Sequence, residues 1–99
     1  MAAIGVLTLE LRLENSHSLK EKRSVVRPIV AELRRRFSVS AAETGALELY
    51  RRASLGVAVT AADRGHVVEV LDAVERLVAA RPEVAVLSAR RGVHRSDDF

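Results

Sequence analysis

Cysteine and tryptophan are absent from this chain of 99 residues. Without cysteine there can be no disulfide, no thiolate zinc site and no thiol nucleophile, and the composition fits a reducing compartment. The aromatic residues Phe37, Tyr50 and Phe99 are too few to build a core, so the core must consist of aliphatic side chains. No apolar run approaches the roughly 18 residues of a membrane span. The first residues also do not show the charged n-region followed by a long apolar h-region that marks a signal peptide. We therefore expect a soluble, cytoplasmic protein with no membrane partner.

Apolar residues make up 48% of the chain, which is enough for one core and therefore one domain. We expect this domain to span residues 1–91 and to be followed by a flexible polar tail at 92–99. The net charge is only +3, but seven cations and two anions lie between Ser16 and Phe37. A local positive surface on a nearly neutral body favours an anionic partner.

Near the start of the chain, hydrophobic residues first recur at every second position, as in a strand, and then at every third or fourth position, as in a helix. The strand face consists of Leu7, Leu9, Leu11 and Leu13. Ser18 then offers a hydroxyl that caps a helix, and Glu21 completes a capping box. The helix is expected to extend to Phe37. Pro28 within it predicts a kink or a break into two helices, and the unbroken phase of the apolar stripe favours one bent helix.

The remaining pattern predicts three further strands and a second helix. The strands are expected at residues 39–44, 55–60 and 84–88. Asp63 caps the second helix, which Arg81-Pro82 ends, and a long connection after Gly45 joins the second and third strands. The order β-α-β-β-α-β predicts an α+β ferredoxin-like plait, a four-stranded antiparallel sheet with both helices on one face. This fold carries many unrelated activities and argues for none of them.

Three segments resemble the YlxP-like family of small bacterial proteins, a domain of unknown function. They are Ser18-Leu19-Lys20-Glu21-Lys22-Arg23, Arg36-Phe37-Ser38-Val39-Ser40 and Tyr50-Arg51-Arg52-Ala53-Ser54-Leu55-Gly56-Val57-Ala58. The resemblance covers nearly the whole chain and implies a ferredoxin-like fold. It also implies a link to RNA or the ribosome, because genes of the family neighbour transcription-termination, translation-initiation and ribosome-maturation genes in many bacteria. It assigns no catalytic residues. The family usually has Asn where Ser38 stands and often Trp where Tyr50 stands.

Four cations of the expected first helix fall within a stripe about 60° wide on a helical wheel. These residues, here called the basic ridge, are Lys20, Arg23, Arg27 and Arg34. They are expected to contact phosphates, with an ordinary solvated helix face as the alternative. The hydroxyls of Ser16 and Ser18, at the start of the helix, are expected to help hold an anion, with capping alone as the alternative. A second basic group near the C-terminus either extends this surface or belongs to a loose tail; it comprises Arg90, Arg91, His94 and Arg95.

The sheet face opposite the helices is expected to carry small residues and no aromatic ring. Its members include Val6, Thr8, Gly56 and Ala58. The absence of rings disfavours the base stacking of RNA-recognition motifs. A flat face of small residues instead suits a second copy of the chain, so we expect a homodimer through this face. Tyr50 is expected to plug an edge of the core, and stacking on a base is the alternative.

Two functional hypotheses from different classes follow. The first is a non-enzymatic module that binds RNA or a ribosomal particle through the basic ridge and reads shape more than sequence. The second is a structural or protein-interaction subunit, dimeric through the open face, with no nucleic-acid role. An enzyme is least favoured, because no nucleophile stands near a base. His17, His66 and His94 lack paired ligand spacing, so neither a metal nor a cofactor is expected.

Overall fold

Strand β1 (Ala3–Arg12) is one of the two inner strands of the sheet, where its alternating leucines are buried on one face. In the computed structural model, which describes residues 2–98, Leu7, Leu9 and Leu11 are at most 1% exposed. Antiparallel ladders join β1 to β3 (Arg52–Ala61) on one side and to β4 (Ala85–Arg95) on the other, and β2 (Ser40–Gly45) pairs with β3. The resulting strand order, β2-β3-β1-β4, confirms the expected ferredoxin-like plait.

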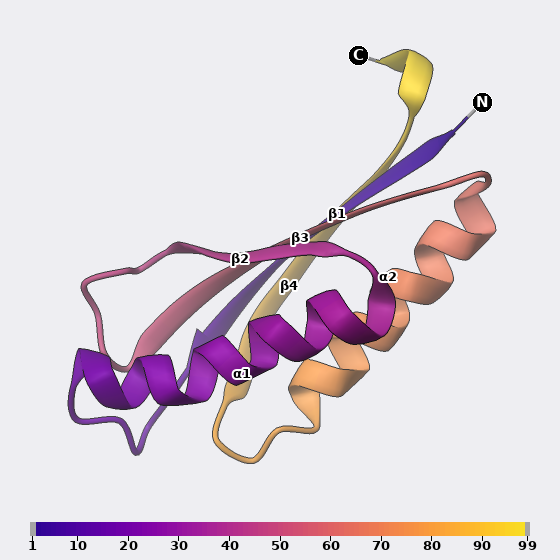
Figure 1. Ribbon diagram of the computed structural model, residues 1–99. Helices are drawn as coiled ribbons and strands as arrows, with labels where there is room; N and C mark the ends of the chain where they lie inside the picture. The colour runs from indigo at the N-terminus through magenta and orange to yellow at the C-terminus, as the bar shows by residue number, and fades with distance from the viewer. Residues whose placement is uncertain (1, 99) are drawn as a thin grey trace.

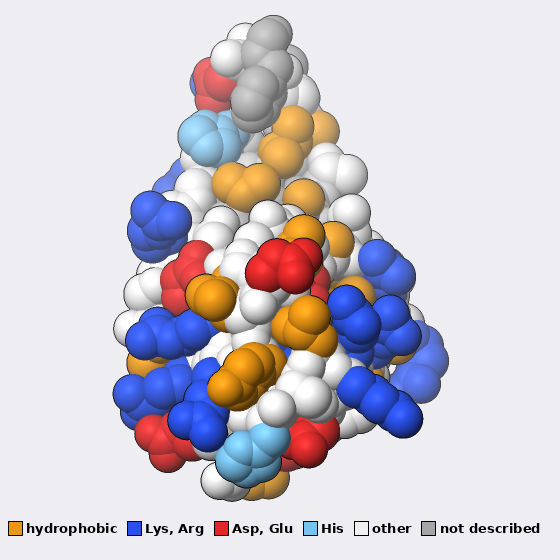
Figure 2. All heavy atoms as spheres, turned by 90° about the vertical axis from the view of Figure 1, so that its left-hand side faces the viewer, with side chains coloured by type: hydrophobic (Ala, Val, Ile, Leu, Met, Phe, Trp, Pro, Cys, Tyr) orange, Lys and Arg blue, Asp and Glu red, His pale blue; other side chains and the backbone are white. Residues whose placement is uncertain are grey.

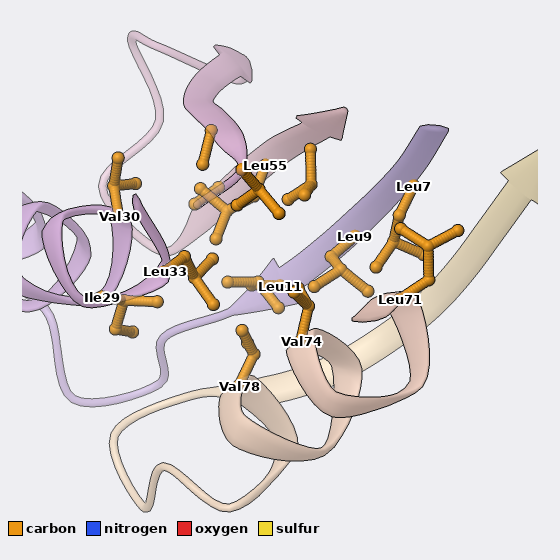
Figure 3. Close-up of a cluster of buried hydrophobic side chains, with 14 of the residues drawn as sticks. Leu7, Leu9, Leu11, Ile29, Val30, Leu33, Leu55, Leu71, Val74 and Val78 are labelled. Atoms are coloured by element: carbon orange, nitrogen blue, oxygen red, sulfur yellow. The ribbon is translucent and has the colours of Figure 1, made fainter. Parts of the chain in front are cut away.

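Helices α1 (Leu19–Phe37) and α2 (Arg64–Ala79) both cover the same face of the sheet (Figure 1). The core lies between them and the leucines of β1, and Leu55 of β3 joins it (Figure 3). Leu33 of α1 and Val74 of α2 are both fully buried there. Each fully buried aliphatic side chain of this size contributes about 1.5–3 kcal/mol, which explains how a domain this poor in aromatic residues can be stable.

The ends of α1 show which local signals set its limits. The Ser18 hydroxyl accepts a hydrogen bond from the Glu21 N–H at 3.0 Å, and the Glu21 carboxylate accepts one from the His17 N–H at 2.8 Å. The predicted Ser18 cap is confirmed, although the carboxylate reaches the residue before the cap. The helix is continuous through Pro28, so the alternative of two helices is wrong. It ends at Ser38, whose left-handed backbone (φ 52°) is a conformation that Asn adopts more readily than Ser.

Strand β4 is longer than predicted and corrects the expected boundary between domain and tail. Residues 92–95 are not a tail, because β4 pairs with β1 as far as Arg95, and Ser96 donates its N–H to the Ala2 carbonyl at 2.8 Å. A 3-10 turn at Ser96–Asp98 follows, and Phe99 lies outside the described residues. Two features hid this strand. It is a largely exposed edge, so polar residues are tolerated, and a β-bulge that omits Leu87 from the register breaks the period of two.

Candidate nucleic-acid interface

Three members of the basic ridge form an exposed line along the outer side of α1. Lys20, Arg23 and Arg27 follow one another at spacings of three and four residues and, with Ser24 and Pro28, line a shallow hollow. Within residues 2–98, no ion pair or hydrogen bond engages their side chains. The structure therefore brings these three cations together with their charges uncompensated, as a surface for phosphate contacts requires.

Arg34, the fourth member of the basic ridge, differs from the other three because it has a partner within the chain. Its Nε donates a hydrogen bond to the Ala41 carbonyl at 2.8 Å and so joins α1 to strand β2. The guanidinium has further N–H donors, and the residue as a whole remains exposed. Arg34 thus holds α1 against the edge of the sheet, and the part of the ridge without an internal partner consists of the other three cations.

The loop before α1 uses its hydroxyls within the chain. Ser16 is only 5% exposed, and its Oγ donates to the Ser18 carbonyl at 3.2 Å. The Ser18 hydroxyl caps the helix, with the Glu21 carboxylate beside it. These contacts are those of the capping interpretation. Anion binding at Ser16 and Ser18 stays a prediction, and the negative charge of Glu21 at this helix end acts against it.

Lys22 is the residue that the sequence interpretation missed. Its side chain is 1% exposed and points into the protein, where Nζ lies 2.7 Å from Oε2 of Glu43. Nζ also donates to the carbonyls of Ala46 (2.9 Å), Arg52 (3.2 Å) and Leu47 (3.4 Å). The sequence holds a signal for this, because Lys22 stands three residues after Leu19 and four before Val26, at a core position of the apolar stripe. One of the seven cations counted for this segment is therefore structural.

The connection between β2 and β3, residues 46–51, carries exposed hydrophobic side chains and is here called the 46–51 knob. Leu47, Leu49 and Tyr50 are 55%, 54% and 44% exposed. The expectation that Tyr50 plugs the core is wrong, since its ring lies outside with the Arg51 guanidinium 5.7 Å from its centroid. Arg51 also donates to the Ser16 carbonyl at 3.1 Å, which ties the knob to the loop before α1. Figure 2 shows this end of the molecule, with basic side chains on both sides of hydrophobic ones.

The basic group near the C-terminus is partly neutralised by carboxylates. Arg91 bonds Asp72 at 2.9 Å and Glu75 at 3.0 Å, both on α2. The hydrogen bond to Glu75, opposed by partial burial and aided by Asp72, raises the pKa of Arg91 above its ordinary value. Arg95 bonds Asp97 at 3.1 Å. Arg91 and Arg95 therefore do not extend the basic ridge.

The structure brings the predicted open-face residues together. Val6 stands opposite Ala58 and Thr8 opposite Gly56 in the β1–β3 ladder, and all four line a shallow recess on the side away from the helices. Val6 is 43% exposed. A methyl group of Thr44 on β2 covers Gly56 so closely that a Cβ at Gly56 would lie 2.7 Å from it. The recess is therefore shaped by small residues of three neighbouring strands.

No helix among residues 2–98 has the length and apolarity to cross a bilayer. Among the same residues, no group of three or more His, Cys, Asp or Glu side chains is placed to hold a metal ion.

The fold and the surface define a small α+β protein of the ferredoxin-like class with an uncompensated basic strip on its first helix. A family model described as "Protein of unknown function (DUF503)" matches residues 4–91, and the chain belongs to this family. It is also similar to the "Uncharacterized protein YlxP" of Bacillus subtilis (strain 168). The two are 31% identical over 81 residues, which cover 82% of this chain and 88% of the relative. The resemblance drawn from the sequence motifs is thereby confirmed.

Proposed function

We propose that this protein is a non-enzymatic binding module for RNA or a ribosomal particle, which it contacts in the cytoplasm through the basic ridge of α1. The observation that carries the proposal is the line of three unpaired cations at regular spacing on one face of α1. Ion pairs with carboxylates engage Arg12, Lys22, Arg36, Arg81, Arg91 and Arg95. Lys20, Arg23 and Arg27 stand in sequence on one helix face with no such partner among the described residues. Unpaired cations at regular spacing are suited to a regular polyanion.

The salt dependence of binding tests this proposal. Three phosphate contacts predict that affinity for a structured RNA falls about 40-fold between about 50 and 200 mM salt. The double substitution Arg23→Ala, Arg27→Ala should reduce the slope of log affinity against log salt by about two-thirds, because it removes two of three contacts. The slope is measured by fluorescence anisotropy with a labelled RNA hairpin.

The matched control removes the same charge from another helix. Arg64→Ala, Arg76→Ala deletes two exposed cations of α2 that have no carboxylate partner within residues 2–98. It should leave the slope nearly unchanged. Absence of measurable binding at low salt, or equal losses in the two double variants, would refute the proposed function.

The alternative function, a protein-interaction subunit that is homodimeric through the open face, is supported by the exposure of Val6, which lines the small-residue recess. Light scattering is then expected to show a dimer at micromolar concentration. Val6→Asp should convert it to a monomer, because a carboxylate would lose its water in the contact. Leu49→Asp, an equally drastic change outside this face, is the control. A monomer at all concentrations up to the millimolar range contradicts this alternative.

A further inference from the structure

The 46–51 knob is ordered in a way that the fold itself does not require. Two antiparallel strands can be joined by a two-residue turn, whereas this connection has six residues. Ala46 has a left-handed backbone (φ 57°), which is a strained conformation for a residue other than glycine. The Leu49 N–H closes a turn on the Ala46 carbonyl at 3.0 Å. The shape of the knob is therefore maintained against strain.

The buried side chain of Lys22 holds the knob in this shape from inside the protein. Nζ of Lys22 bonds carbonyl oxygens at both ends of the connection, those of Ala46 and Leu47 at its start and that of Arg52 just after it. Despite this anchoring, Leu47 and Leu49 remain more than half exposed. Ordering a loop while leaving its apolar side chains in water gains little stability, so the arrangement favours a role in contacts outside the chain.

Basic side chains lie on both sides of hydrophobic ones at the end of the molecule that carries the knob (Figure 2). On the helix side are Lys20 and Arg23 of the basic ridge. On the strand side, Arg12 and Arg52 face each other directly in the β1–β3 ladder, a juxtaposition of like charges that destabilises a sheet. Arg12 has a partner in Glu14 at 3.1 Å, but within residues 2–98 no carboxylate pairs with Arg52. A knob that exposes the apolar side chains of Leu47 and Leu49, with one charge of each sign at Glu48 and Arg51, thus separates two positive flanks.

A ligand that complements this shape has two negative strands with a shallow, less charged floor between them. We propose that the knob enters the minor groove of double-stranded RNA, with the two cationic flanks on the phosphates of opposite strands. The minor groove of A-form RNA is wide and shallow, whereas that of B-form DNA is about 6 Å wide. This inference rests on the proposed function and specifies its substrate class.

The charge distribution favours RNA over a protein groove as the occupant. If the knob entered a groove in a protein, that protein would need acidic residues along both edges of the groove. The cations of this chain would then be confined to the vicinity of the knob. Here the helix-side flank extends along α1 to Arg27, the third unpaired cation in line. Such an extended line follows a phosphate backbone.

The test compares three labelled probes in low salt by fluorescence anisotropy, namely an RNA duplex, a DNA duplex of the same sequence and one RNA strand. The unmodified protein should prefer the RNA duplex to the DNA duplex about tenfold, which is the effect of one good groove contact. Leu47→Ser, Leu49→Ser should abolish this preference while the salt slope persists, because the ridge is intact. Both side chains are more than half exposed, so the variant should fold. Leu87→Ser, at a leucine 39% exposed on β4, is the control and should keep the preference.

Each outcome separates this inference from the proposed function. Equal affinity for RNA and DNA duplexes, tighter binding of the single strand, or a preference that survives in the double serine variant overturns the minor-groove contact while RNA binding by the ridge stands. If the double serine variant binds all three probes as the unmodified protein does, the leucines of the knob make no contact with nucleic acid and the inference is wrong. If no probe binds in low salt, the proposed function itself has failed.

Discussion

Replacing Lys22 with methionine is expected to lower the free energy of unfolding by about 3 kcal/mol, near the lower limit for removing one member of a buried ion pair. The substitution keeps most of the side-chain volume but leaves Glu43, whose side chain is 18% exposed, without its cation. The carbonyls of Ala46 and Arg52 lose their donor as well. For a domain of this size the melting temperature should fall by at least about 12 °C. Urea denaturation and calorimetry measure both effects.

Lys20→Met is the matched control for this prediction. Lys20 lies two residues earlier on the same helix and is exposed, so its substitution should change stability by less than about 0.5 kcal/mol. Adding Glu43→Gln to Lys22→Met should recover part of the loss, because the uncompensated carboxylate is removed while the carbonyls remain without a donor. If Lys22→Met is as stable as Lys20→Met, the lysine does not hold the 46–51 knob.

The fold was predictable because its strongest signals are local. Leucines at every second position all point to the same face of a strand, so the alternation predicts which face is buried. Ser18 offers a helix cap after the end of that strand. Both outcomes hold in the structure. The extent of β4 was not predictable in this way, since an edge strand gains its order from backbone bonds to β1 and needs no apolar alternation.

The candidate site was only partly predictable, for a different physical reason. A helical wheel gives the direction of a side chain but not the partner that it meets. Lys20, Arg23 and Arg27 point outward as expected, whereas Arg34 finds the Ala41 carbonyl of β2, which lies next to α1 only after folding. Lys22 is the opposite case. A lysine is expected to be exposed, and only the folded structure shows that Glu43 of β2 pairs with it in the interior. The sequence pattern therefore cannot predict contacts with residues that lie on other elements and come close only on folding.

At Gly5, helix α2 approaches the sheet so closely that no side chain fits between them. It is buried on the leucine face of β1, and a Cβ there would collide with Cγ1 of Val67 and lie 3.0 Å from Cδ1 of Leu71. The first turns of α2 therefore pack directly on the backbone of β1. The small residues at this end of the strand, Ala3 and Gly5, leave the space that the leucines fill further along.

Gly5→Val is accordingly expected to destabilise the protein by about 3 kcal/mol, because α2 must move away from the sheet to admit the side chain. Chemical denaturation measures the loss. Gly65→Ala on α2 is the control, since its Cβ would have only an ordinary 3.4 Å contact with Oδ1 of Asp63, and it should be neutral or slightly stabilising. Combining Gly5→Val with Val67→Ala should restore part of the stability by returning the volume. If Gly5→Val unfolds no more easily than the unmodified chain, or if Val67→Ala only adds to its loss, the close approach of α2 to β1 is not the constraint at this position.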